Sequence, residues 1–489
     1  MVSFAPHAYA SHTPKSPDRS TLRKHPVWGL GPLALCLVTL LIGPGDLFPE
    51  TSSLNAARAQ TEKSHTDTLA ARAFQQGDYD QVLRLYQDTR DTLAGKGPPL
   101  SQSFLRLATM SYVRLGRAEE ALPLYRQLVS AGTPEDRPLL RELAWSMVSS
   151  HVRDSSEHVR IAAYGVLGEV RRPAVVPLLE DGLLDTSITV RAKAAEAMGH
   201  HAKSVKTSRL IRLLDDPSST VRIAAISTLG ILGADGVRGR LAQIARADEG
   251  PEGIFAAGAL VRLGREDMLT DIKGAATLPD AEIRMAALGV LGRLKRPNTL
   301  TVLTQAVYDP NAAVRAFAAG ALGEFGDPAG TAALTHAIAD EDPRVRSIGA
   351  ASLGRLGGAH IRILLQPLKR DADDLVRASA IEGLLRSGEQ DVMLMAADLA
   401  KHPAPMVRAA VAHGVGVPGN KAAIGLLEQL LRDQHPQPRL AAARSLGRIG
   451  PIAIEPMIHA LEDSEPAVRI TAAGSLMQVI DGQRTRKTS

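Results

Sequence analysis

The segment DPSSTVRIAAISTLGILG, residues 216–233, is one copy of a pattern that recurs along this chain. Acidic and hydroxyl residues come first, where the free N–H groups of a helix start need acceptors, and a proline accompanies them. Apolar residues then continue a helix, and Gly233 stands where a left-handed residue can end it. A second apolar segment follows each copy, for example residues 329–339 or 453–461. Each copy therefore predicts a hairpin of two helices.

An arginine returns at a nearly constant interval in these copies. The interval is 31 residues, one position is skipped at Gly253, and the last interval is one residue shorter. The arginines are Arg160, Arg191, Arg222, Arg284, Arg315, Arg346, Arg377, Arg408, Arg439 and Arg469. A period of this size indicates stacked copies of one small unit, each in contact with its neighbours. We therefore predict an all-α fold, a right-handed α-solenoid.

The composition agrees with a helical array and argues against nucleic acid as a partner. Aromatic residues make up only 3% of the chain, so the core must consist of alanine, leucine, valine and isoleucine. Without residues 1–59 the chain carries 52 basic and 49 acidic residues, a net charge of +3. Such a balance provides no electrostatic footprint for nucleic acid, and few aromatic rings are available to stack with bases.

Residues 1–59 have the features of a signal peptide. The apolar stretch 27–42 follows basic residues, contains the only cysteine and is short for a membrane-spanning helix. A small-x-small pattern predicts cleavage between Ala59 and Gln60. We expect a periplasmic or secreted protein that is free of cysteine after cleavage. The alternative is an uncleaved segment that anchors the protein to the inner membrane through residues 27–48, which would be its only membrane contact.

Residues 60–135 carry a different repeat. Tyr112 is followed by Gly116 between two expected helices, by Ala121 at their crossing and by Tyr125 on the second helix. This spacing resembles the tetratricopeptide repeat. The resemblance implies helical hairpins that continue directly into the main array.

The main repeat extends over residues 136–482. In most units an alanine stands three residues after the arginine and a glycine eleven residues after it. These units resemble the HEAT-like repeats of phycobilisome lyases. The resemblance implies a stack of helical hairpins, and residues 483–489 remain as a basic, disordered tail.

The resemblance also brings two enzyme classes into consideration. Chromophore lyases of the phycobilisome type contain such repeats, and deoxyhypusine hydroxylase binds iron through paired His–Glu dipeptides on them. No His–Glu dipeptide occurs in this chain, and its histidines stand at different positions of the repeat. Scattered histidines do not supply the converging ligands that a metal ion needs. We therefore expect no metal, no cofactor and no catalytic residue.

Most of the arginines have an acidic residue six positions earlier. These acids are Asp154, Asp185, Asp216, Asp309, Asp340, Asp371, Asp433 and Asp463. We expect the repeated pair to form a ladder of charge-assisted hydrogen bonds between adjacent units. Each partly exposed pair would contribute about 0.2–1 kcal/mol. Because nearly every unit carries the pair, we interpret the ladder as structural, since a catalytic centre would single out one or two units.

One unit departs from the pattern. Gly250, Pro251, Glu252 and Gly253 replace its helix start, and both ladder residues are missing from their usual positions. We expect a hinge or a binding notch at this point. The alternative is a unit that has diverged without functional consequence.

These observations predict an exported, non-enzymatic scaffold or adaptor. Stacks of this kind hold protein or peptide partners on a long concave surface. We expect the second helix of each unit to line that surface. An enzyme on the same fold, a lyase or a hydroxylase, is the alternative.

Overall fold

The computed structural model describes residues 65–92, 100–130, 136–202, 205–358 and 360–487, and all their regular structure is helical. The apolar stretch, the cleavage site Ala59–Gln60 and the anchor expected at 27–48 lie outside the described residues. Within the described ranges, no helix combines the length and the apolar character that crossing a membrane requires.

The described part of the chain begins with two helical hairpins, each with a tight turn at a glycine. Helical residues 65–75 precede α2 (Tyr79–Thr92), and α3 (Gln102–Arg114), α4 (Ala118–Ser130) and α5 (Arg137–Ser150) follow. Gly77 and Gly116 make the turns at φ of 79° and 74°, a left-handed backbone that glycine adopts without steric cost. Thr61–Ser489 form one compact unit, which includes these helices and the main array.

In the main array a long helix alternates with a short one. The long helices are α6 (Glu157–Glu169), α8 (Ile188–Met198), α10 (Ser219–Ile231), α12 (Pro251–Arg262), α14 (Ala281–Leu294), α16 (Ala312–Phe325), α18 (Pro343–Leu356), α20 (Asp374–Arg386), α22 (Pro405–Val415), α24 (Pro436–Ile449) and α26 (Pro466–Lys487). The short ones are α7 (Val175–Gly182), α9 (Ser208–Arg212), α11 (Arg238–Ala247), α13 (Met268–Ala275), α15 (Leu300–Gln305), α17 (Thr331–Ala337), α19 (Ile361–Leu365), α21 (Val392–Leu399), α23 (Ile424–Leu430) and α25 (Ile454–Ala460).

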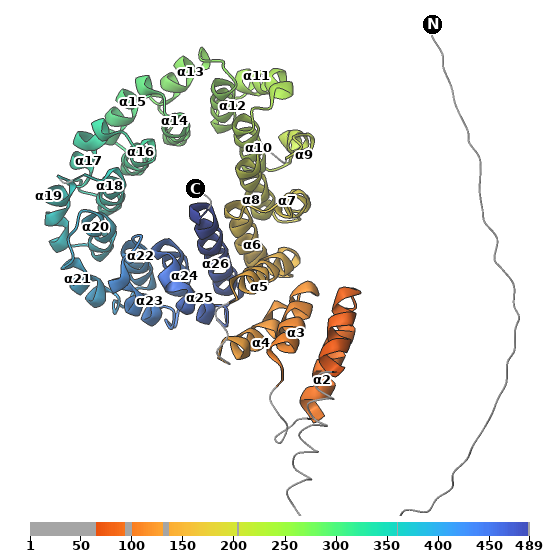
Figure 1. The fold of residues 1–489 in the computed structure, drawn as a ribbon. Helices are drawn as coiled ribbons and strands as arrows, with labels where there is room; N and C mark the ends of the chain where they lie inside the picture. The colour runs from red at the N-terminus through yellow and green to blue at the C-terminus, as the bar shows by residue number, and fades with distance from the viewer. Residues whose placement is uncertain (1–64, 93–99, 131–135, 203–204, 359, 488–489) are drawn as a thin grey trace, which may run out of the picture. The chain divides into compact units, whose positions relative to one another are not determined.

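The long helices form the inner layer of the curved array and the short helices the outer layer (Figure 1). The expectation that the second helix of each unit lines the concave surface is therefore wrong. The physical reason is the size of the contact residues. Neighbouring inner helices touch through a glycine eight positions after the ladder position, such as Gly230 against Ala259 or Gly354 against Gly383. A Cβ on Gly354 would lie 2.7 Å from the Cα of Gly383, so only such small residues allow the close spacing on the inside of a curve.

Most inner helices are tied to the next one by an arginine, which in most of these pairs reaches the acid 25 residues later. Arg315 donates from Nε and Nη2 to the two carboxylate oxygens of Asp340 at 2.7 and 2.9 Å. Its Nη1 donates to the backbone carbonyls of Asp309 and Pro310 at 3.1 and 3.3 Å. Seven further pairs share this two-bond arrangement: Arg160–Asp185, Arg191–Asp216, Arg222–Glu252, Arg284–Asp309, Arg346–Asp371, Arg408–Asp433 and Arg439–Asp463.

The acids also begin the inner helices. Asp340 Oδ1 accepts the N–H of Asp342 at 2.9 Å, and the other ladder aspartates cap their turns in the same way, Asp154 included. The hydrogen bonds from Arg315 lower the pKa of Asp340. The pairs are more buried than expected, with 11% of the Arg315 side chain and 5% of the Asp340 side chain exposed. Their loss therefore costs more than the loss of a surface ion pair.

One rung contains a histidine in place of the acid. His402 stands 25 residues after Arg377, and its Nδ1 accepts the N–H of Ala404 at 3.0 Å, as an aspartate would. Its Nε2 lies 2.8 Å from Oδ2 of Asp374, which also pairs with Arg377. A local carboxylate thus replaces the missing one.

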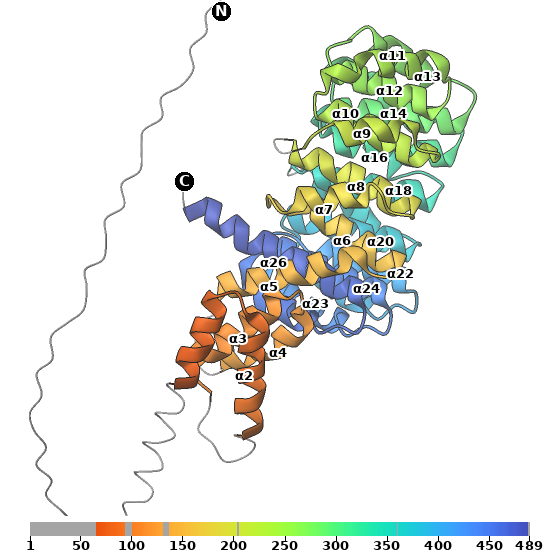
Figure 2. The ribbon, with the colours of Figure 1, turned by 90° about the vertical axis from the view of Figure 1, so that its right-hand side faces the viewer.

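The array closes on itself, because its last helix packs against α5 and α6 (Figures 1 and 2). The last ladder arginine, Arg469, donates to Glu119 of α4 at 2.6 Å. Gln478 donates to Glu169 of α6 at 2.6 Å. Helix α26 extends to Lys487 and so includes most of the segment assigned to a disordered tail.

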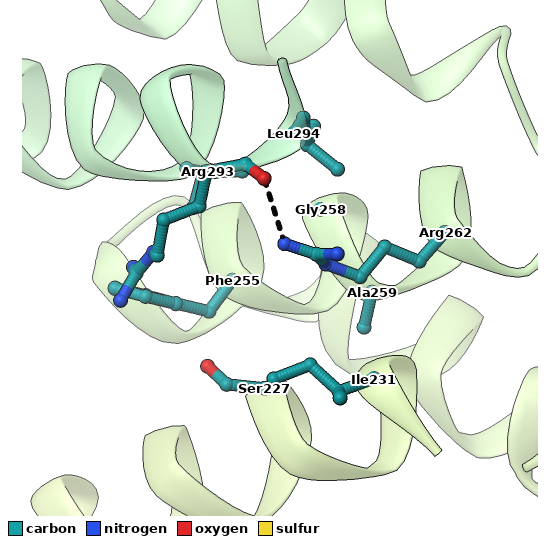
Figure 3. A pocket seen from close by; sticks show the side chains of 9 residues that line it. Ser227, Ile231, Phe255, Gly258, Ala259, Arg262, Arg293 and Leu294 are labelled. Carbon is teal, nitrogen blue, oxygen red and sulfur yellow. Dashed lines mark hydrogen bonds between the residues drawn. The ribbon is translucent and has the colours of Figure 1, made fainter. Parts of the chain in front are cut away.

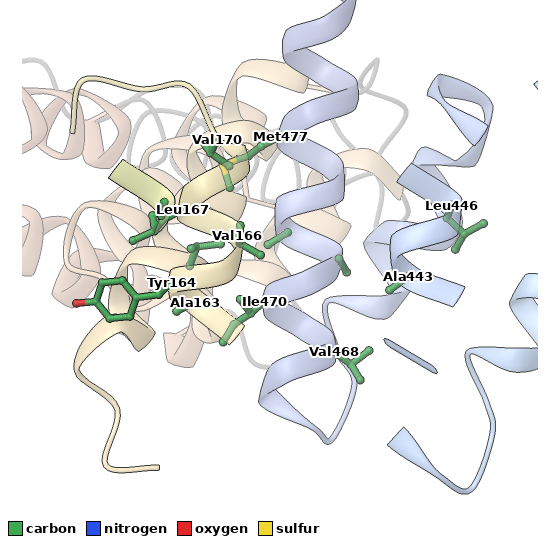
Figure 4. Packing of buried hydrophobic residues seen from close by; sticks show 14 of the residues in the cluster. Ala163, Tyr164, Val166, Leu167, Val170, Ala443, Leu446, Val468, Ile470 and Met477 are labelled. Carbon is green, nitrogen blue, oxygen red and sulfur yellow. The ribbon is translucent and has the colours of Figure 1, made fainter. Parts of the chain in front are cut away.

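Buried apolar side chains form the contact between α6 and α26 (Figure 4). Val166 of α6, Val170 directly after this helix, and Ile470 and Met477 of α26 are all buried. A Cβ on Gly474 would lie 2.6 Å from Cγ1 of Val166, so the glycine is required for this approach.

We expect Asp340→Asn to destabilise the array by about 1–3 kcal/mol, since it leaves the largely buried Arg315 guanidinium without its carboxylate. The asparagine can still cap the turn by accepting the N–H of Asp342, so the loss of stability measures the contribution of the charge pair. Hydrogen exchange should rise in α16 and α18, and thermal unfolding should shift downward. Asp327→Asn is the matched control, because Asp327 caps a turn through the N–H of Ala329 without an arginine partner. An equal loss in both variants would contradict the role assigned to the pair.

Candidate binding surface on the inner face

Each inner helix is covered on most sides by its neighbours. The neighbouring inner helices cover its flanks and its short partner covers its back. On α18, the exposed residues are Pro343, Arg344, Ile348 and Arg355, which apart from Pro343 follow helical spacing along one side. Because every unit repeats the same register, equivalent stripes line up around the inner face.

Two rows of side chains result. The apolar row lies two residues after the ladder position and contains Phe255, Phe317 and Ile348, of which Phe317 is 43% exposed. The arginine row lies nine residues after the ladder position and consists of Arg262, Arg293, Arg355, Arg386 and Arg448. Glu324 occupies this position on α16. These arginines stand 31 or 62 residues apart, so the repeat period alone could have predicted this second row.

The two rows enclose a hollow between α10, α12 and α14 (Figure 3). Its volume is about 50 Å³, and it is lined by Ser227, Ile231, Phe255, Gly258, Ala259, Arg262, Val290, Arg293 and Leu294. The guanidinium of Arg293 stacks over the ring of Phe255, with its Cζ 5.1 Å from the ring centroid. Arg262 lies two turns after Phe255 on α12, and its Nη2 donates to the backbone carbonyl of Arg293 at 2.9 Å.

The hollow has an excess of positive charge. Within the described part of the chain, neither Arg262 nor Arg293 forms an ion pair, and Arg293 donates only to the carbonyl of Gly289 at 3.1 Å. Burial and the charges of Arg293 and Arg296 lower the pKa of Arg262, while Glu324 acts in the opposite direction. Arginine nevertheless stays protonated at neutral pH, so two cations face a small hollow without a counterion.

Comparison with known proteins identifies the repeat. The family model of HEAT repeats matches residues 144–199, 183–257, 300–384, 361–435 and 424–487. The chain belongs to the HEAT repeat family. The predicted resemblance and the all-α solenoid are thereby confirmed. No curated protein matches the sequence.

Solved structures that are similar to this chain include enzymes and an engineered protein. Human deoxyhypusine hydroxylase in complex with glycerol is 18% identical, with a TM-score of 0.30 over 53% of this chain and 100% of that one. The complex of CpcE and CpcF of phycocyanin lyase from Nostoc is 21% identical, with a TM-score of 0.31 over 52% and 92%. An engineered protein is 16% identical, with a TM-score of 0.26 over 69% and 98%. Similarity at this level transfers no activity to this chain.

The divergent HEAT unit starts directly beside the hollow. Gly250, Pro251, Glu252 and Gly253 form the start of α12, two residues before Phe255. The acid is absent from its usual position in this unit, but Glu252 takes its place and accepts from Arg222 at 2.9 and 2.5 Å. In most other units one aspartate both accepts from the arginine and caps the turn. Here Glu252 accepts from the arginine, and Asp248 caps the turn by accepting the N–H of Gly250 at 2.6 Å.

Only the arginine of this unit is missing. Gly253 occupies its position, and a Cβ there would lie 1.8 Å from the carbonyl oxygen of Asp248. Leu278 stands 25 residues later, where an acid would accept from that arginine. The contact with the preceding unit is therefore retained, and the rung toward the following unit is absent.

A second charged cluster joins α20, α22 and α24. Glu382 accepts from Arg386 at 2.9 and 3.2 Å and lies 3.4 Å from Nε2 of His413 and 3.8 Å from Nη1 of Arg448. Burial raises the pKa of Glu382, but His413, Arg386 and Arg448 outweigh it and lower the pKa to about 2. In this part of the arginine row, Glu382 thus supplies a shared counterion to Arg386 and Arg448.

The histidines that the structure describes form no metal-binding cluster. His336 stacks on Tyr308 with the ring centroids 4.3 Å apart, and His201 contacts the carbonyl of Leu167 at 3.1 Å. Burial lowers the pKa of His201. Among the residues placed by the structure, no group of three or more histidine, cysteine, aspartate or glutamate side chains could hold a metal ion.

We expect Glu382→Gln to destabilise the array by about 1–3 kcal/mol at pH 6, because the charged form is the one held by its three partners. Since the folded pKa lies below the unfolded value of 4.5, this contribution is complete above pH 4.5. It disappears as the pH falls toward 2. The difference in melting temperature between the variant and the parent protein should therefore shrink over this interval. Glu324→Gln, an exposed acid on α16, is the control and should show little change at any pH. A pH-independent difference for Glu382→Gln would contradict the argument.

Proposed function

We propose that this protein is a non-enzymatic scaffold or adaptor that binds an extended segment of a partner protein along the inner face of its HEAT array. The observation that carries the proposal is the pair of unneutralised arginines, Arg262 and Arg293, beside the exposed apolar row. Charged groups that the fold leaves unpaired on a repeated surface are typical of binding surfaces rather than of structural contacts.

The spacing of the units suits an extended chain. Packed helices lie about 8–10 Å apart, and an extended chain advances about 3.3 Å per residue. One unit therefore corresponds to about three residues of the partner. Side chains at every third position would meet the apolar row or the arginine row in successive units, so affinity would be the sum of many modest contacts.

We further propose that the protein acts after export, in the periplasm or outside the cell, with a native N-terminus at Gln60. The alternative is retention at the inner membrane through residues 27–48. N-terminal sequencing of the native protein distinguishes the two. An enzyme on the same fold is the alternative to a scaffold, and bound iron or a visible absorption band in the purified protein would establish it.

The scaffold proposal predicts that partners can be captured from the inner face. A photoreactive phenylalanine analogue at Phe317, 43% exposed on α16, should cross-link to a protein partner in intact cells. The same analogue at Ile363, 71% exposed on the outer helix α19, is the matched control and should not. Cross-links formed only from the outer position, or equally from both, would contradict binding on the inner face.

A further inference from the structure

We infer that the hollow between Arg262 and Arg293 is a carboxylate-binding site, which receives an acidic side chain or the C-terminal carboxylate of the partner's segment. This inference rests on the proposed scaffold function and names the chemistry that the inner face selects. The residues that carry it are the two arginines and Phe255, with Ile231 on the opposite side (Figure 3).

The volume of the hollow limits the ligand to a small group. A water molecule requires about 10–15 Å³ of such space, so about 50 Å³ accommodates three or four atoms of that size. A carboxylate has three heavy atoms and fits. A nucleotide, a sugar or a chromophore does not, although the remainder of a peptide can continue along the open inner face.

Both guanidinium groups are held in place before any ligand arrives. Arg262 is tethered to the carbonyl of Arg293, and Arg293 is held by the carbonyl of Gly289 and by the ring of Phe255. Each guanidinium has five N–H donors, and these contacts occupy one donor of each. The other donors include the paired N–H groups that match the two oxygens of a carboxylate. Preorganised donors lose little entropy on binding.

The surroundings of the hollow also favour a single negative charge with an apolar neighbour. Arg296 adds positive charge, although it pairs with Glu266 at 2.6 Å, and Glu324 is the acid that weakens the attraction. Ile231 is 51% exposed at the edge of the hollow. An acidic residue next to an aliphatic or aromatic one would therefore occupy both the hollow and its edge.

The test is fluorescence anisotropy with the full-length protein and labelled nonapeptides of the repeating sequence valine–glutamate–serine, amidated at the C-terminus. A glutamine-for-glutamate peptide with an amidated end should bind at least tenfold more weakly. The same glutamine peptide with a free C-terminus tests whether a terminal carboxylate suffices. Recovery of affinity in that arm identifies the terminal source, and binding of the amidated glutamate peptide alone identifies the side-chain source.

The variant Arg262→Gln with Arg293→Gln should weaken binding of the carboxylate peptide at least tenfold. The control removes the same charge from the outer layer, as Arg212→Gln in α9 with Arg370→Gln in the 3-10 helix η8 (Gln366–Arg370), and should change affinity less than twofold. Equal losses in the two double variants, or no preference for carboxylate peptides, would overturn the site.

A third variant tests the site in a protein that stays folded. Ile231→Glu places a carboxylate at the edge of the hollow, where it should pair with Arg262 and block the peptide while the melting temperature is maintained or raised. Unchanged peptide affinity in this folded variant would also overturn the site. If partners are still captured from Phe317 when the pocket variants have no effect, the carboxylate site fails and the scaffold proposal stands. If capture from Phe317 fails as well, the proposed function itself is refuted.

Discussion

The inner face of this protein depends on one interaction, the hydrogen-bonded pair between an arginine and the acid 25 residues later. Arg315 binds both oxygens of Asp340 and at the same time the carbonyls of the turn that begins its own helix. The pair therefore sets the rotation of one inner helix relative to the start of the next. Because rotation is set in the same way in successive units, residues at equal distances from the arginine align. The apolar row and the arginine row are consequences of that alignment.

Small residues determine which layer faces inward. The inner helices approach each other through glycine, alanine and serine, as at Gly230 and Ala259 or Gly323 and Ser352. The short outer helices carry larger aliphatic side chains to the shared core, such as Leu303 and Leu334. A wide outer spacing and a narrow inner spacing produce curvature. Curvature in turn brings the last helix back to the first helices.

Much of this arrangement could be predicted from the sequence, because a fixed period repeats both the helix pattern and the charged residues. An acid six residues before the next arginine necessarily stands 25 residues after the previous one, so the rung at Arg315 follows from counting. The role of Glu252 in the divergent unit could not be predicted by counting. Its acid stands at a different position of the repeat, and Asp248 caps the turn in its place. The hollow was missed because it needs residues of three helices, and no local pattern predicts such a meeting. The partner of Arg469 was equally hidden, because Glu119 lies 350 positions away, in a helix that precedes the main array.

The closure at α26 also concerns how copies of the protein behave toward one another. An open stack of repeats ends in two unsatisfied faces that are complementary to each other, because every unit is built to receive the next. Head-to-tail contact between such faces does not close and leads to filaments. Here the exposed end of the array is occupied by its own beginning, through Gly474 against Val166 and Arg469 against Glu119. A protein of this construction can carry a long repeated surface at high concentration without polymerising through its ends.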